Sequence, residues 1–216
     1  MLQANLKFIS HRKVRKIVVT SSVTAEGKSE VSANLAAVIA QSGKRVLLVD
    51  ADMRKPTQHH LWGLINSVGL SHLLVDQGVF SQAVQKVTEF LAVLTAGVIP
   101  PNPLALIDSE GMTSLVDIFA ENYDYVIFDT PPLAGIADAA VLGKMADGIL
   151  LVTRPGVLDA PSAAAKSLLE RSEANVLGIV ANAVNAKQEP SSYFYYSNLR
   201  DRNSTADLER VPQQLK

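Results

Sequence analysis

Five side chains of this sequence have the chemistry to hold a phosphate group together with a divalent cation. Lys28 and Ser29 lie in a Gly-Lys-Ser tripeptide, and Asp50, Asp52 and Asp129 lie where apolar runs end. A lysine in such a tripeptide brings positive charge close to the β- and γ-phosphates, and a serine hydroxyl can bind Mg²⁺. Carboxylates can hold the cation or take a proton from the group that attacks the phosphate. These residue types predict a site for a nucleotide with Mg²⁺.

The tripeptide matches a phosphate-binding loop only in part. In the pattern G-x-x-x-x-G-K-[ST] the first glycine position is held by Ser22, so only the second half fits. The alternative interpretation is a polar helix start after a strand. The apolar run before the loop and the carboxylate-bearing run RVLLVDAD after it favour the loop, whose N–H groups would bind phosphate oxygens. The residues predicted to contact the nucleotide are Thr24, Ala25, Glu26, Gly27, Lys28, Ser29 and Glu30.

Strands and helices alternate along the chain and would bring these residues together. The predicted strands are apolar almost from end to end, which is typical of a parallel sheet covered by helices on both faces. We therefore predict an α/β, doubly wound fold, in which ligands bind where the carboxyl ends of the strands meet. The predicted strands span residues 16–22, 45–50, 91–95, 124–129, 148–153 and 175–184.

The predicted helices vary in the strength of their pattern. Residues 29–41 place apolar side chains on one face before Gly43, whereas residues 58–78 are irregular apart from GLSHLLV. The adjacent His59 and His60 point in different directions, so we expect both at the surface and no shared metal. Further helices are predicted over residues 81–87, 104–109, 112–121, 138–145 and 160–171.

Composition limits the classes of protein that fit. The chain has 216 residues, 48% of them hydrophobic, a net charge of −1 and no cysteine. This predicts one large domain, no general attraction to nucleic acid and no disulfide framework. No apolar run is long enough to span a membrane, and we expect a soluble intracellular domain.

The two ends of the chain differ from the middle. Residues 1–15 are basic and without acidic residues, which fits either a solvated lead-in or a segment that faces anionic lipid. Residues 16–186 are the predicted nucleotide-binding domain. Residues 187–216 are polar, and we predict a disordered tail. That tail carries a cluster of tyrosines at Tyr193, Tyr195 and Tyr196.

Taken together, the motifs resemble a known family. The resemblance covers nearly the whole chain and is carried by LQANLKF, VVTSSVTAEGKSEVSANLA, VLLVDADMRKP, LTAGVIPPNPLAL, YDYVIFDTPP, ADGILLVTRPG and the tyrosine-bearing tail. These segments are similar to the cytoplasmic catalytic domain of bacterial tyrosine kinases of the capsular and exopolysaccharide (polysaccharide co-polymerase) family. The pairing of LLVDADMRKP with YDYVIFDTPP is the specific part of the match.

The resemblance implies an ATP-dependent autokinase that uses Mg²⁺. It assigns Lys28 and Ser29 to the Walker A motif, Asp50 and Asp52 to Walker A′, and Asp129 to Walker B. Asp50 would then be the base toward tyrosine, and Ser29, Asp52 and Asp129 would hold the cation. The three tail tyrosines would be autophosphorylated in trans, between subunits of a ring-like homo-oligomer.

The resemblance also implies partners and a location. The expected partner is a membrane-embedded activator or co-polymerase segment on the same parent chain, at the cytoplasmic face of the inner membrane, where the kinase would regulate polysaccharide export. The absence of that segment here suggests a domain cut from a longer protein. The loop departs from the family's P-G-E-G-K-S-T by carrying Ala25 and Glu30, which bears on nucleotide affinity.

Two alternatives to a kinase remain open. A ParA/MinD-like ATPase switch would carry a signature lysine early in the loop, where this chain has Val23. The other alternative is a nucleotide-binding structural module with little turnover, and Ala25 and Glu30 keep this alternative open.

Asn182, on the last predicted strand, is a candidate contact for the adenine edge. The alternative is a strand asparagine that is hydrogen-bonded to neighbouring backbone.

Overall fold

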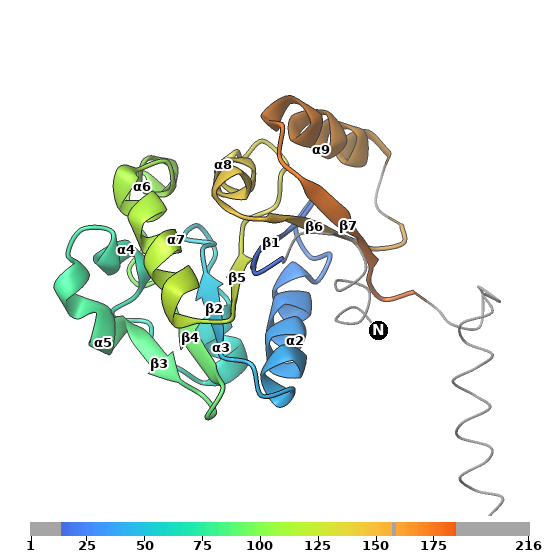
Figure 1. Ribbon diagram of the computed structural model, residues 1–216. Coiled ribbons are helices and arrows are strands. Elements are labelled where there is room, and N and C mark those ends of the chain that lie inside the picture. The colour runs from blue at the N-terminus through green and yellow to red at the C-terminus, as the bar shows by residue number, and fades with distance from the viewer. Residues whose placement is uncertain (1–13, 157–158, 185–216) are drawn as a thin grey trace, which may run out of the picture. The chain divides into compact units, whose positions relative to one another are not determined.

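The fold is a mixed sheet with helices on both faces, which confirms the predicted doubly wound α/β class. The computed structural model describes residues 14–184 apart from 157–158, so the predictions for residues 1–13 and for the tyrosine-bearing tail lie outside it. The sheet has the strand order β3-β4-β2-β5-β1-β6-β7 (Figure 1). Its strands are β1 (Lys16–Ser21), β2 (Val46–Asp50), β3 (Val84–Lys86), β4 (Leu91–Leu94), β5 (Tyr125–Asp129), β6 (Gly148–Thr153) and β7 (Val176–Ala181).

Two apolar layers separate the sheet from its helices. Because successive side chains of a strand point to opposite faces, Ile17 and Val19 of β1 join one layer and Val18 joins the other. The first layer packs against α2 (Lys28–Gln41) and α3 (Gln58–Trp62). The second packs against α4 (Leu70–Leu73), α5 (Phe80–Ala83), α6 (Pro103–Ile107), α7 (Glu110–Asn122), α8 (Asp138–Met145) and α9 (Asp159–Ser172).

The predicted helix over residues 81–87 is wrong. Helix α5 ends at Ala83, and the next three residues form β3, which pairs antiparallel with β4. Thr88 closes the connection, because its hydroxyl accepts hydrogen bonds from the amides of Phe90 and Leu91. A three-residue strand is too short to show an alternating pattern of its own, so its partner β4 decides its conformation.

One helix in a stretch predicted as irregular is α3. Its first residue is Gln58, and the amide of Gln58 is bound by the carboxylate of Asp50, the last residue of the preceding strand, rather than by a local cap.

The strand β1 is fixed at its start by Asp147, whose Oδ2 accepts hydrogen bonds from the amides of Arg15 and Lys16 at 2.7 and 2.8 Å. Arg15 also donates to the carbonyls of Ala120 and Tyr123 at the end of α7.

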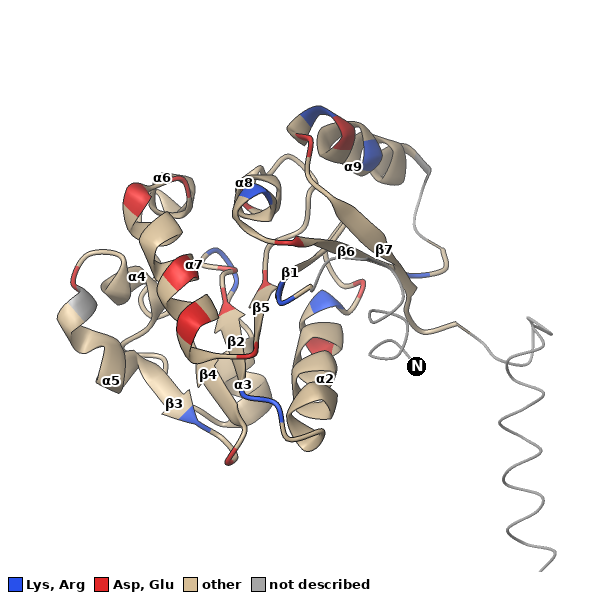
Figure 2. Cartoon of the chain, viewed as in Figure 1, with Lys and Arg blue, Asp and Glu red and all other residues tan. Residues whose placement is uncertain are grey.

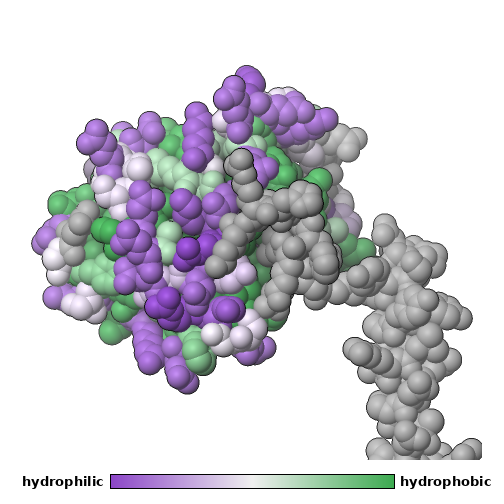
Figure 3. Space-filling model, viewed as in Figure 1, coloured by the Kyte–Doolittle hydropathy of each residue, from purple (hydrophilic) through white to green (hydrophobic). Residues whose placement is uncertain are grey.

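Apolar side chains also reach the surface. Figure 3 shows hydrophobic residues between hydrophilic ones on the face in view. Val75, Val98 and Ile179 are more than half exposed, at 81%, 62% and 67%. Within the residues that the structure describes, no helix is both long and apolar enough to cross a bilayer.

Candidate active site

The sheet brings the predicted site residues to one edge. Strands β1, β2 and β5 are parallel neighbours, so their carboxyl ends lie side by side. In this register Asp129 lies beside Val19 on one strand and beside Asp50 on the other. Strands β2 and β5 each end in an acidic residue and α2 begins with a basic one (Figure 2). Lys28, Asp50, Asp52 and Asp129, predicted from distant segments, therefore meet at one place.

The loop between β1 and α2 has the backbone form of an anion-binding turn. Ala25 and Gly27 have positive φ angles of 64° and 89°. Gly27 is the N-cap of α2 and no side chain caps the helix, so the first-turn amides of Lys28, Ser29 and Glu30 keep donors for a ligand. These features fit the phosphates of a nucleotide.

Glu26 braces this loop from inside. Its side chain is 1% exposed, and its carboxylate accepts hydrogen bonds from the amides of Val23 (2.9 Å) and Arg154 (3.2 Å). Its carbonyl accepts from Nδ2 of Asn182 at 2.9 Å. The loop is thereby attached to the ends of β6 and β7. The Asn182 amide bonds to backbone here, as one of the two interpretations of this residue expects.

The ammonium of Lys28 lies among oxygen atoms of three other site residues. Its Nζ is 2.9 Å from Oδ2 of Asp52, 3.2 Å from Oγ of Ser29 and 3.8 Å from Oδ1 of Asp129. Burial lowers the pKa of Lys28, but the negative charges of Asp129, Asp52 and Asp50 outweigh burial and raise it overall. Lys28 is therefore held as a cation.

The same oxygens suit Mg²⁺. Oδ1 of Asp129 is buried and has no hydrogen-bond donor in the described part of the chain, so it is an acceptor available to a cation. No group of three acidic, histidine or cysteine residues able to bind a metal occurs among the described residues. Mg²⁺ in nucleotide sites is commonly held by one or two carboxylates together with phosphate oxygens. Ser29, Asp52 and Asp129 fit that arrangement and would hold the cation against a bound nucleotide.

Asp50 is completely buried and tied to the backbone. Its Oδ2 accepts the amides of Thr57 (3.0 Å) and Gln58 (2.9 Å), and its Oδ1 accepts the amide of Asp52 at 3.3 Å. Burial and the charge of Asp129 raise the pKa of Asp50 to about 8. Burial also raises the pKa of Asp129, against the opposing effects of Lys28 and Gln58. The two carboxyl groups therefore differ in their partners although they are neighbours in the sheet.

Sequence reasoning missed two other interactions at this edge. The side chain of Gln58 donates to Asp129, and Arg54 forms a paired contact with Asp138 at 3.1 and 3.2 Å. Asp138 is 1% exposed at the start of α8, so this pair connects the segment after β2 to α8. Arg54 lies in the motif VLLVDADMRKP, so the sequence could have indicated that it belongs to the site. Gln58 lies outside every motif, and nothing in the sequence indicated its contact.

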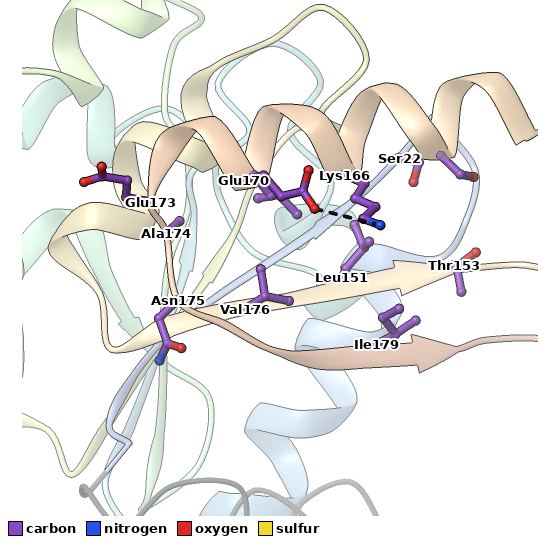
Figure 4. A pocket seen from close by; sticks show the side chains of 12 residues that line it. Ser22, Leu151, Thr153, Lys166, Glu170, Glu173, Ala174, Asn175, Val176 and Ile179 are labelled. Atoms are coloured by element: carbon purple, nitrogen blue, oxygen red, sulfur yellow. Dashed lines mark ion pairs between the residues drawn. The ribbon is translucent and has the colours of Figure 1, made fainter.

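A pocket of about 630 Å³ lies away from the lysine and the aspartates. It is formed between α9 and the strands β6 and β7, and Lys166 and Glu170, one turn apart on α9, form an ion pair of 3.8 Å along one wall (Figure 4). Ile179 and Leu151 contribute apolar surface to its floor. Of the residues near the phosphate loop, Ser22 lines it, but none of the predicted catalytic residues does.

Comparison with known proteins identifies the class. Residues 13–196 match the family model described as "ParA: NUBPL iron-transfer P-loop NTPase". A solved ParA family ATPase from Chlorobium tepidum TLS has the same fold, with a TM-score of 0.66 at 22% identity over 81% of this chain and 76% of that one. The chain is therefore a P-loop NTPase of the ParA type.

Closer relatives define the family more narrowly. The chain is 44% identical over 198 residues to tyrosine-protein kinase YwqD of Bacillus subtilis (strain 168), covering 90% of this chain and 83% of that protein. The crystal structure of the chimerical protein CapA2B2 superimposes with a TM-score of 0.81 at 39% identity, over 85% of this chain and 82% of that one. The chain belongs to the bacterial tyrosine-protein kinases, as the motif resemblance predicted.

Relatives differ in length. Tyrosine-protein kinase etk of Escherichia coli (strain K12) is 36% identical over 181 residues, which is 83% of this chain but only 25% of that protein. The chain thus spans most of YwqD and about a quarter of etk.

Proposed function

We propose that this chain transfers the γ-phosphoryl group of ATP to tyrosine side chains of other copies of the same chain. The observation that carries the proposal is the convergence of Lys28, Ser29, Asp52 and Asp129 beside a helix start with free amides. Phosphoryl transfer depends mainly on positioning and on neutralising charge, and this arrangement supplies both. The names of the relatives, which are tyrosine-protein kinases, support tyrosine as the acceptor.

Each residue has a separate role in the proposed reaction. The amides of α2 and the Lys28 ammonium bind the phosphates, and Mg²⁺ held by Ser29, Asp52 and Asp129 would neutralise their charge. The tyrosine oxygen attacks the γ-phosphorus, its proton passes to Asp50, and ADP leaves. Because the pKa of Asp50 is raised to about 8, the carboxyl group is mainly ionised only above that pH, and it acts as a base in that form. The ionised carboxylate has about four lone-pair positions, and Asp50 uses three of them for backbone amides. One position is left for the proton.

The proposed acceptors are Tyr193, Tyr195 and Tyr196, which lie outside the described residues. From Val184, the last described residue, nine peptide steps lead to Tyr193 and span at most about 30 Å when fully extended. Such a short connection restricts which site the tyrosine can reach, whereas an assembly of copies offers further sites. We therefore propose transfer in trans within a ring-like homo-oligomer.

The biological setting is part of the same proposal. We place the kinase at the cytoplasmic face of the inner membrane, with a membrane-embedded activator or co-polymerase segment as its partner and polysaccharide export as the regulated process. The names CapB and CapA2B2 among the relatives are consistent with a capsule-related setting. Nucleic acid is not a proposed partner, since the net charge is −1.

A second candidate is an ATPase switch without kinase activity. The match of residues 13–196 to the ParA family model favours it. The residue at position 23 is evidence against this candidate. That class carries a signature lysine there, whereas this chain has a valine, whose amide donates to Glu26.

Incubation with Mg²⁺-ATP followed by mass spectrometry separates the candidates. Phosphotyrosine on the chain is the expected result. ATP hydrolysis without phosphotyrosine would favour the switch, and tight nucleotide binding with neither would favour a structural module.

A further inference from the structure

The side-chain amide of Gln58 connects two of the motifs at the site. Gln58 is completely buried. Its Nε2 donates to Oδ2 of Asp129 at 2.8 Å and to the carbonyl of Ser29 at 3.1 Å. Its Oε1 accepts from Nε1 of Trp62, one turn further along α3, at 3.1 Å. The two N–H groups and the oxygen of this amide are therefore all in use.

The chemistry of its partners fixes the orientation of the amide. The indole N–H of Trp62 can only donate, and the Ser29 carbonyl and an ionised Asp129 can only accept. A rotation of the Gln58 amide by 180° would place like groups against one another at all three contacts. Trp62 thus holds the N–H groups of Gln58 toward Asp129 and Ser29.

This contact decides which oxygen of Asp129 is available. With Oδ2 bonded to Gln58, the remaining oxygen, Oδ1, is the one without a donor and lies 3.8 Å from the Lys28 ammonium. The Ser29 carbonyl, bonded to the same amide, belongs to the residue whose hydroxyl is a candidate cation ligand. One glutamine therefore sets the spacing between two candidate ligands.

We propose that Gln58 is a positioning residue of the cation site. It holds one oxygen of Asp129 and the backbone of Ser29, so that the other oxygen of Asp129 and the Ser29 hydroxyl face the same cation. The proposal rests on the proposed function only for the presence of a nucleotide with Mg²⁺ at this site. It does not depend on tyrosine being the acceptor.

The test measures Mg²⁺-dependent binding of ADP, which involves no phosphoryl transfer. Gln58→Met keeps the length of the side chain and the backbone amide bonded to Asp50 but removes the three side-chain hydrogen bonds. Loss of a group that orients a metal ligand commonly reduces metal affinity by about 10–100-fold. We expect the Mg²⁺ concentration for half-maximal ADP binding to rise by about that factor, with ADP affinity in EDTA unchanged.

Gln85→Met is the matched control. Gln85 also makes two side-chain hydrogen bonds, both to the backbone of Ile65, but it lies on β3 at the far edge of the sheet. Its substitution is expected to leave the Mg²⁺ requirement unchanged. An unchanged Mg²⁺ requirement in Gln58→Met, or an equal rise in Gln85→Met, would overturn the proposal.

Trp62 provides a second measurement on the unaltered chain. It is the single tryptophan, and its N–H is one hydrogen bond from Gln58 and two from Asp129. Addition of Mg²⁺ to the ADP-bound wild type is expected to shift its fluorescence, which keeps the proposal testable should Gln58→Met fail to fold. No Mg²⁺-dependent shift would overturn it. A wild type that shows the shift but never forms phosphotyrosine would refute the proposed function and leave the role of Gln58 intact.

Discussion

Lys28 and Asp52 form an ion pair of 2.9 Å although they come from different motifs 24 residues apart. Asp52 is 3% exposed at its side chain and Lys28 12%, so the pair is shielded from water. Without a nucleotide, the lysine neutralises the carboxylates that would hold Mg²⁺. A bound phosphate would offer the lysine a second anionic partner. The pair therefore links occupancy of the phosphate loop to the segment after β2.

Lys28→Ala is expected to abolish most ATP binding and to reduce phosphotyrosine formation by at least about 10²-fold, because a group of this kind stabilises the charge of the transition state. Phosphotyrosine is measured by mass spectrometry and ATP binding by calorimetry. The variant also leaves Asp52 and Asp129 without their cation, so its folding is checked by circular dichroism. A folded variant that retains phosphotyrosine would refute the assignment of the phosphate loop.

Substitution of the aspartates is expected to separate their roles. Asp50→Asn should slow transfer by about 10²–10⁴-fold, the usual contribution of a catalytic base, with binding of Mg²⁺-ADP nearly intact. Asp129→Asn should weaken that binding as well, because it removes the negative charge of the carboxylate whose Oδ1 is available to the cation. Titrations with Mg²⁺-ADP and initial rates of transfer give the two quantities. An equal loss of Mg²⁺-ADP binding in both variants would contradict the division of roles.

Gly27→Ala is expected to disrupt the phosphate loop. A Cβ at Gly27 would lie 2.0 Å from Nδ2 of Asn182, and the φ angle of 89° is unfavourable for alanine. Gly43→Ala is the matched control at the other end of α2, with a φ angle of 76° and no atom within 4 Å of an added Cβ. Both should lose about 1–2 kcal/mol of folding free energy from the backbone.

Only Gly27→Ala should also lose ADP affinity. Thermal denaturation and ADP titration measure the two effects. Normal ADP affinity in Gly27→Ala would show that the loop tolerates the displacement of Asn182.

Much of the fold was predictable because strands buried on both faces contain an unbroken apolar run. This holds for β1, β2, β5 and β6, whose predicted bounds lie within a residue of those observed. The edge strand β3 could not be predicted, because its three residues show no alternating pattern and its pairing with β4 determines its structure.

The site, like the fold, could be predicted only in part. Lys28, Asp52 and Asp129 could be placed together because parallel strands end at one edge. The inward direction of Glu26 could not be predicted, because one of its two amide partners is that of Arg154, 128 residues away. The role of Gln58 likewise depends on contacts with Ser29 and Asp129 that only the tertiary structure creates.

Asn182→Ala tests whether this residue recognises the base. Its amide supports the loop through the Glu26 carbonyl, so some loss of affinity for every nucleotide is expected. If the side chain also contacts adenine, the ratio of ATP to GTP affinity should fall, since an amide offers a donor and an acceptor to the adenine edge. Competition binding with both nucleotides measures the ratio. Equal losses for ATP and GTP would assign Asn182 to loop support alone.

The central claim, that this site phosphorylates tyrosines of another copy, is tested most directly by mixing two variants. One chain carries Lys28→Ala with its tail intact, and the other has an intact site with Tyr193, Tyr195 and Tyr196 replaced by Phe. With Mg²⁺-ATP, phosphotyrosine is predicted on the tail of the Lys28→Ala chain. In the wild type alone, the initial rate should rise faster than linearly with protein concentration. An unlabelled Lys28→Ala chain, beside wild type that labels itself at a rate per molecule independent of concentration, would contradict the account.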